Sequence, residues 1–178
     1  KENEYDDLIK GKRKPLFPFK FSKLKSNLNH TLWFLPSVAS CHAMKNLLEQ
    51  RQNIFYRDFS INVAAGNKAG IGANALPPVL KSMENPLYSK TITLTCGKLT
   101  QGVSVKPWSG IFMLRNTATP ETYFQSAFRV QTPWTLKNEN GNDVNEETVL
   151  KNECYIFDFA PNRSLKLIND YASKLNLS

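Results

Sequence analysis

Short apolar runs alternate with amphipathic helical stretches from His30 onward, and this alternation limits the fold more than any other feature. The apolar runs carry hydrophobic residues on both faces, which is typical of strands buried in a parallel sheet. Parallel strands need long crossovers, and the helical stretches supply them. The sequence therefore predicts a three-layer α/β domain with a mostly parallel sheet flanked by helices. The predicted strands are 32–35, 61–64, 91–95, 110–115 and 155–159, and the predicted helices are 36–50, 74–84, 119–130 and 162–175.

Residues 1–29 lack this pattern and form a predicted basic N-terminal arm or interdomain linker, so the predicted domain covers residues 30–178. The chain has a formal net charge of +8, and seven basic residues with no acidic ones lie between Leu8 and Lys25. Such a strip suits a phosphate backbone, because each neutralised phosphate releases counterions. A solvated basic linker is the alternative. The candidate nucleic-acid-binding residues are Lys10, Lys12, Arg13 and Lys14.

Aromatic and apolar residues interleave with Pro and Lys in the same arm, at Leu16, Phe17, Phe19 and Phe21. This pattern is typical of an extended segment that packs against a surface. We expect the surface to be a neighbouring domain. Stacking on the bases of a single strand is the alternative.

Several classes of protein do not fit the sequence. No run of about 18 apolar residues occurs and no signal sequence is present, so we expect a cytoplasmic protein without a membrane span. The chain begins at Lys1 without an initiator Met, which suggests a segment of something longer. Cys41, Cys96 and Cys154 are odd in number and widely spaced, which favours reduced thiols. Cys41 and His42 lack a second pair at zinc-ligand spacing, so no metal site is predicted.

Two segments that follow predicted strands carry candidate functional residues. Thr100 and Gly102 offer a hydroxyl and a close backbone approach to a phosphate, although such turns are common in ordinary loops. Gln125 and Arg129 lie one turn apart on the predicted helix 119–130. A planar guanidinium suits a transferring phosphoryl group, whereas a solvated helix face is the simpler interpretation on spacing alone. We expect both segments at the carboxyl ends of the strands, where such sheets bind ligands.

The order of these pieces resembles the motif V to motif VI block of superfamily-2 helicases and translocases. The block runs from Thr95 to Pro133, with Thr100 and Gly102 at motif V positions and Gln125 and Arg129 at motif VI positions. The segment HTLWFLPSVASCHAM, which begins at His30, resembles motif IV. The segments LTQGVSV, SGIFMLRN and YFQSAFRVQTPW are most similar to helicase subunits of restriction systems, of the type III (Res-like) kind.

The resemblance implies the C-terminal (second) RecA-like lobe of an ATP-dependent DNA helicase or translocase. Arg129, oriented with help from Gln125, would stabilise charge on the γ-phosphate, and Thr100 and Gly102 would couple the ATP site to the DNA track. ATP and Mg²⁺ would be held mainly by the first RecA-like lobe of the same polypeptide. The implied partners are double-stranded DNA and methyltransferase or specificity subunits. We expect the chain alone to show no ATPase activity.

The sequence itself agrees that the main phosphate cradle lies elsewhere. No Gly-x-x-x-x-Gly-Lys-Ser/Thr pattern occurs, and residues 65–70 contain Gly and Lys in the wrong order for a phosphate-binding loop. Asp158 and Glu153 could suggest a nuclease, but no Lys stands at the usual spacing from them.

Three departures from the family pattern bear on the mechanism: Ser104 at the acidic position of motif V, Phe128 at the glycine of motif VI, and Thr132 at its second arginine. Arg129 would then act as the only arginine finger, unless Arg115 or Arg163 substitutes for the missing one. The alternative function is a non-catalytic α/β module that binds DNA or a protein through its basic arm.

Overall fold

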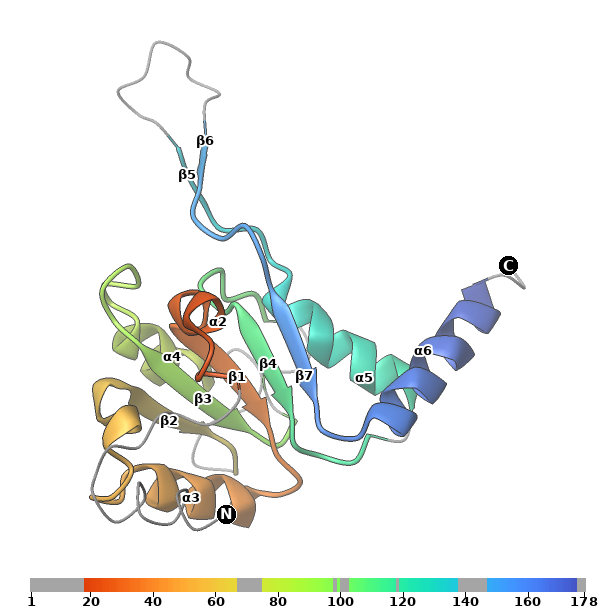
Figure 1. Ribbon diagram of the computed structural model, residues 1–178, viewed down its shortest axis with the longest axis horizontal. Coiled ribbons are helices and arrows are strands. Elements are labelled where there is room, and N and C mark those ends of the chain that lie inside the picture. The colour runs from red at the N-terminus through yellow and green to blue at the C-terminus, as the bar shows by residue number, and fades with distance from the viewer. Residues whose placement is uncertain are drawn as a thin grey trace.

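Five parallel strands form the central sheet of the domain (Figure 1). The computed structural model describes residues 18–66, 75–97, 99, 103–117, 119–137 and 147–175. The strand order is β2-β3-β1-β4-β7, so β1 lies at the centre. The bounds are β1 His30–Phe34, β2 Ser60–Ala64, β3 Thr91–Thr95, β4 Gly110–Met113 and β7 Tyr155–Asp158. The sequence predicts each of these strands, and no observed end differs from the predicted one by more than two residues.

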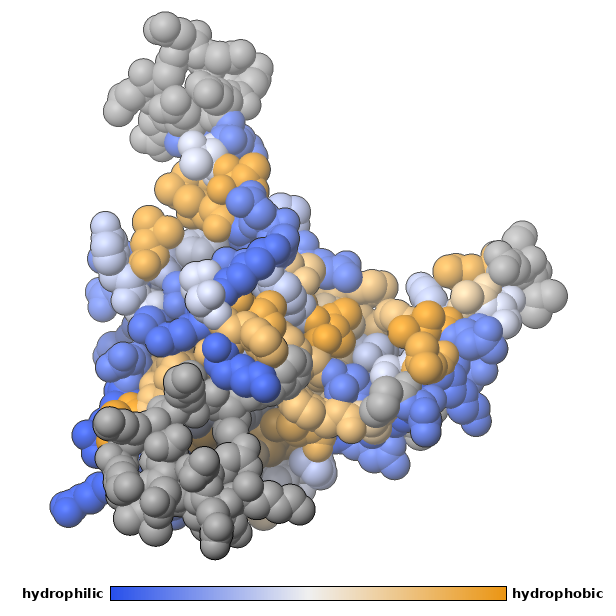
Figure 2. Space-filling model, in the orientation of Figure 1, coloured by the Kyte–Doolittle hydropathy of each residue, from blue (hydrophilic) through white to orange (hydrophobic). Residues whose placement is uncertain are grey.

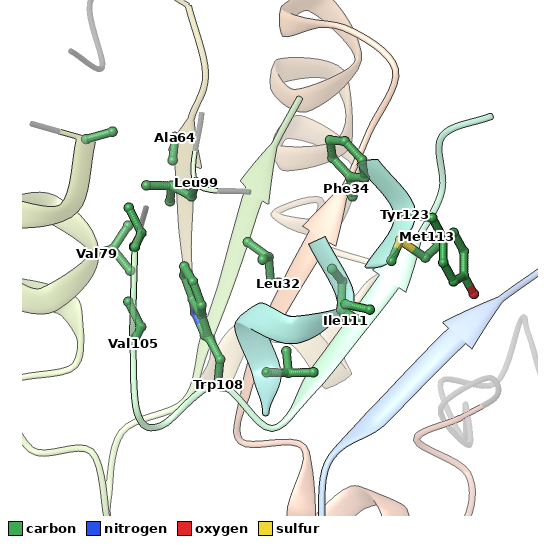
Figure 3. Close-up of a cluster of buried hydrophobic side chains, with 14 of the residues drawn as sticks. Leu32, Phe34, Ala64, Val79, Leu99, Val105, Trp108, Ile111, Met113 and Tyr123 are labelled. Atoms are coloured by element: carbon green, nitrogen blue, oxygen red, sulfur yellow. The ribbon is translucent and has the colours of Figure 1, made fainter. Parts of the chain in front are cut away.

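Helices cover both faces of the sheet, because the buried strands present apolar side chains in both directions. Leu32 and Phe34 of β1 belong to one buried cluster, whereas Trp33 between them belongs to the other. Figure 3 shows the first cluster, in which Leu32, Ile111 and Met113 from the strands meet Trp108 and Tyr123. This face is covered by α4 (Leu76–Ser82), α5 (Pro120–Ala127) and part of α6 (Pro161–Leu175). The opposite face is covered by α2 (Ser22–Asn27), α3 (Val38–Leu48) and the 3₁₀ helix η1 (Ile54–Asp58).

The arrangement is the three-layer RecA-like α/β fold that the sequence predicts. Local signals account for the ends of its helices. Ser37 and Ser40 form a capping box before α3, in which each side chain bonds to the backbone N–H of the other residue. Thr119 caps α5 as predicted, since its Oγ1 accepts a hydrogen bond from the Thr122 N–H at 3.4 Å. The last predicted turn of this helix is a separate 3₁₀ turn, η4 (Phe128–Val130).

The described part of the N-terminal arm packs on the sheet of its own domain. The Phe19 side chain is 2% exposed and its ring stacks on Phe112 at a centroid distance of 5.8 Å. The expectation that Phe19 packs on a neighbouring domain is therefore wrong, because an apolar face of the same domain buries it. The candidate residues Lys10, Lys12, Arg13 and Lys14 lie outside the described residues.

A short hairpin interrupts the α/β pattern where the sequence predicts a polar turn or insertion. Its strands are β5 (Thr135–Lys137) and β6 (Glu147–Val149), which pair antiparallel and extend away from the sheet (Figure 1). Leu136 and Val149 are exposed, and Figure 2 shows apolar side chains along this stem. Strands of three residues are too short to give a periodic sequence signal.

The helices and the cysteines bear on two expectations from the sequence, namely that the chain has no membrane span and that its thiols are reduced. Among the described helices, none combines the length and the apolar character that crossing a membrane requires. Cys41 is buried, Cys96 is half-buried and Cys154 is exposed, and all three carry free thiols.

Candidate functional site

Arg129 lies at the edge of the sheet where the strands begin, here called the amino edge. Helix α5 starts next to the end of β4 and runs back along the sheet, and its eight residues span about 12 Å. Helix α5 therefore ends near the start of β7 (Figure 1), and η4, which includes Arg129, follows it directly. The expectation that Arg129 lies at the carboxyl ends of the strands is therefore wrong, although the start of α5 does lie there.

Two backbone carbonyls hold the Arg129 guanidinium. Its Nε donates a hydrogen bond to the Gln125 carbonyl oxygen at 3.0 Å, and its Nη1 donates to the Val103 carbonyl oxygen at 2.7 Å. Val103 directly follows the predicted motif V turn and is 2% exposed. The structure thus brings the predicted motif VI arginine to the segment that leaves motif V. Thr100 and Gly102 themselves lie outside the described residues.

The neighbouring positions show how the departures from the family pattern are accommodated. Phe128, at the glycine position of motif VI, has φ −64° and ψ −16°, so the backbone there does not require glycine. Its side chain is 43% exposed. Ser104, at the acidic position of motif V, and Gln125 are both exposed, and Thr132 is half-buried. The substituted side chains therefore fit at or near the surface without strain in this backbone.

Lys151 is a residue of this site that the sequence did not reveal. Its ammonium donates hydrogen bonds to the carbonyl oxygens of Lys106, Trp108 and Val130, each at 2.9 Å. Burial lowers the pKa of Lys151 to about 8, and the Cys154 thiol opposes this shift. Because all three acceptors are backbone atoms, no side-chain pattern marks their partner in the sequence.

The two arginines considered as substitutes for the missing finger lie at the other edge of the sheet. Arg115 follows β4, donates to the Cys96 carbonyl oxygen at 3.1 Å, and places its guanidinium carbon 5.3 Å from the centre of the Phe34 ring. Arg163, in the first turn of α6, donates to Asp158 Oδ1 at 2.7 Å and to Asn116 Oδ1 at 3.1 Å. Both side chains are engaged in contacts that hold strand ends together, away from Arg129.

Asp158 and Glu153 lie at opposite ends of β7, so the two carboxylates do not form one site. Asp158 ends the strand and pairs with Arg163, and Glu153 precedes it and pairs with Lys23 at 3.2 Å. Within the described ranges, no group of three or more His, Cys, Asp or Glu side chains could hold a metal ion. The nuclease interpretation therefore gains no support from the position of these two acids.

Arg129 and its neighbours are suited to contacting a nucleotide, but they do not supply the main binding site for its phosphates. A guanidinium has five N–H groups, and among the described residues the backbone carbonyls of Gln125 and Val103 engage two of those of Arg129. A phosphate-binding loop does not occur anywhere in the sequence. The other N–H groups of a guanidinium held in this way are chemically suited to phosphate oxygens.

Comparison with curated proteins gives a relative in Mycoplasma pneumoniae, described as "Putative type II restriction enzyme and methyltransferase RM.MpnORF110P C-terminus". The two sequences are 34% identical over 147 residues, which cover 82% of this chain and 19% of that protein. This chain is similar to part of a restriction enzyme. It spans about a fifth of the length of that relative.

Among solved structures, a similar one is the ATP-dependent Type ISP restriction-modification enzyme LlaBIII bound to DNA. The TM-score is 0.49 at 15% sequence identity, and the match covers 71% of this chain and 8% of that one. No family model matches the sequence.

Proposed function

We propose that this chain is the second RecA-like lobe of an ATP-driven DNA translocase that forms part of a restriction enzyme. The observation that carries the proposal is the hydrogen bond from Arg129 to the Val103 carbonyl oxygen. It joins the two segments that resemble motifs V and VI, although 26 residues separate them in the chain. The similarity to a restriction enzyme over 147 residues supports the same assignment.

The role of Arg129 follows from how it is held. Two carbonyl oxygens fix its Nε and Nη1 groups, so the rest of the guanidinium is oriented before any phosphate arrives. Bound ATP, with Mg²⁺, would supply the phosphoryl group that is transferred to water. A preorganised cation at that phosphate lowers the barrier because it needs little rearrangement when negative charge develops.

The Val103 contact also suggests how hydrolysis is coupled to movement along DNA. If Arg129 moves with the phosphate, its hydrogen bond to Val103 would move the 103–108 segment with it. This segment directly follows Thr100 and Gly102. Closing and opening of the two lobes would then be transmitted to the turn that we assign to the DNA track. Gln125 contributes its backbone carbonyl to this arrangement.

Arginine substitution in the polypeptide that carries both lobes tests the proposal. Arg129→Ala should reduce DNA-stimulated ATP hydrolysis by about a thousandfold or more, the range known for arginine fingers. DNA affinity should change little. Arg129→Lys should stay strongly impaired, because an ammonium cannot reproduce the forked contacts. Arg51→Ala, at an exposed site after α3, is the matched control and should hydrolyse ATP normally.

Normal turnover by folded Arg129→Ala protein would overturn the proposal. It would favour the alternative, a module that binds DNA or a protein without hydrolysing ATP. Far-ultraviolet circular dichroism and a thermal melt on each variant exclude unfolding as the cause of a loss.

A further inference from the structure

Lys151 joins two segments that are distant in the chain. Its ammonium contacts the carbonyl oxygens of Lys106 and Trp108, before β4, and of Val130, at the end of η4. An ammonium has three N–H groups, and three carbonyls receive them at 2.9 Å. Lys151 is thus fully engaged by the protein backbone.

Arg129 joins the same two segments from the other side. It precedes Val130 directly, and it bonds to Val103, three residues before Lys106. Among the described residues, no backbone–backbone hydrogen bond connects 103–108 with 128–131. Apolar packing of Val103, Trp108 and Val130 holds the segments together. Such packing is not directional, so the polar contacts of Arg129 and Lys151 fix how the segments sit along each other.

Lys151 lies on a part of the chain that is itself held in place, so its ammonium can fix the relative position of the two segments. It lies between β6 and β7, and the neighbouring Leu150 N–H donates to the Trp134 carbonyl oxygen at 2.9 Å. This bond closes the base of the hairpin. Lys151 is therefore held in place by the hairpin base as well as by its own ammonium bonds.

We propose that Lys151 is a positioning residue that sets the place of Arg129 by fixing Val130 against the segment before β4. This inference rests on the proposed function of Arg129. A lowered pKa of about 8 still leaves Lys151 mostly protonated at neutral pH, when all three carbonyls can be satisfied. Removal of the ammonium frees η4 to shift, and displacement of a catalytic group by about 1 Å can cost a hundredfold in rate.

The test uses Lys151→Met in the polypeptide that carries both lobes, since Met keeps the length of the side chain and removes its hydrogen bonds. We expect kcat for ATP hydrolysis to fall by about tenfold to a hundredfold. KM for ATP and the affinity for DNA should each change by less than about twofold, because the substitution removes no contact to ATP or to DNA. Lys166→Met, on an exposed position of α6, is the matched lysine control and should retain the normal kcat.

A second control separates positioning from simple loss of stability. Ile61→Ala removes a buried side chain from the opposite face of the sheet, so it destabilises the domain without touching Lys151 or Arg129. At a temperature where both variants are folded, Ile61→Ala should keep its kcat while Lys151→Met loses it. Equal losses in the two variants, or a normal kcat in Lys151→Met, would overturn the role of Lys151. Normal turnover in Arg129→Ala would instead overturn the proposed function itself.

Discussion

The Arg129 guanidinium donates a hydrogen bond to the Val103 carbonyl oxygen 2.7 Å away, and this contact joins η4 to the chain that leads into β4. The acceptor belongs to the backbone, so the contact does not depend on which side chain stands at position 103. It does depend on the length of α5, which brings Arg129 to the amino edge, and on the path of the chain between β3 and β4. The fold thereby brings two sequence segments that resemble helicase motifs into contact.

Phe19 should contribute far more to stability than Phe21, although both belong to the predicted arm. Phe19 is 2% exposed and lies among Phe55, Phe59 and Phe112, whereas Phe21 is 48% exposed. Phe19→Ala should lower the free energy of unfolding by about 3–5 kcal/mol, as for other buried aromatic residues. Phe21→Ala should cost less than about 1 kcal/mol. Urea denaturation of both variants measures the difference, and similar losses would show that Phe19 is not part of the core.

Gly110 should resist substitution because the start of β4 lies against the end of the N-terminal segment. A Cβ atom at this position would clash with Cδ2 of Leu28, which is fully buried, and would lie 3.6 Å from Phe157 Cε2. Gly110→Ala should therefore cost about 1–3 kcal/mol. The cost should shrink in a Leu28→Ala background, where the obstructing atoms are gone. A double-mutant cycle measured by denaturation checks this coupling, and strict additivity would contradict it.

Much of the central sheet could be predicted because its strands carry strong local signals. Thr91–Thr95 is largely β-branched and fully buried, and the strand was predicted at its observed bounds. Thr119 and Pro120 likewise mark the start of α5. In such segments, local preference and tertiary burial agree.

Other elements depend on contacts that no local pattern encodes. Helix α2 has six residues and no side-chain cap, and its place follows from the burial of Phe19 and Leu28 on either side of it. Arg129 could be selected by its resemblance to motif VI, but its location required the length of α5 and the strand order. Lys151 gave no signal, because its partners are backbone carbonyls.

His30 should make the domain less stable below about pH 6.5. Its Nε2–H donates to the Pro86 carbonyl oxygen at 2.8 Å, so in the neutral ring Nδ1 accepts from Thr91 Oγ1 at 2.9 Å. Burial lowers the pKa of His30 in the folded protein, while the Pro86 contact opposes the shift. Below the unfolded pKa of about 6.5, the unfolded chain therefore binds a proton that the folded chain resists.

The expected result is a free energy of unfolding that falls as the pH drops from 6.5 towards 5, by up to about 1.4 kcal/mol per pH unit from this group. Urea denaturation at several pH values measures the slope. His30→Gln should flatten it even if the variant is less stable throughout. His42→Gln, at an exposed position of α3, should leave it unchanged. An unaltered slope in His30→Gln would assign the pH dependence to other groups.

The ion pair between Asp158 and Arg163 should respond unequally to loss of its two members. The Asp158 side chain is 6% exposed and that of Arg163 is 22% exposed, so the carboxylate is the more deeply buried charge. Arg163→Met leaves this carboxylate without its cation and should cost about 3–5 kcal/mol. Asp158→Asn should cost less, because an amide oxygen can still accept from the Ala160 N–H and from Arg163.

In the double variant Asp158→Asn with Arg163→Met, no charge is buried, and the loss should be smaller than for Arg163→Met alone. Denaturation at pH 7 ranks the three variants, and an Asp158→Asn loss equal to or above that of Arg163→Met would show that burial of the carboxylate does not set the energetics of the pair.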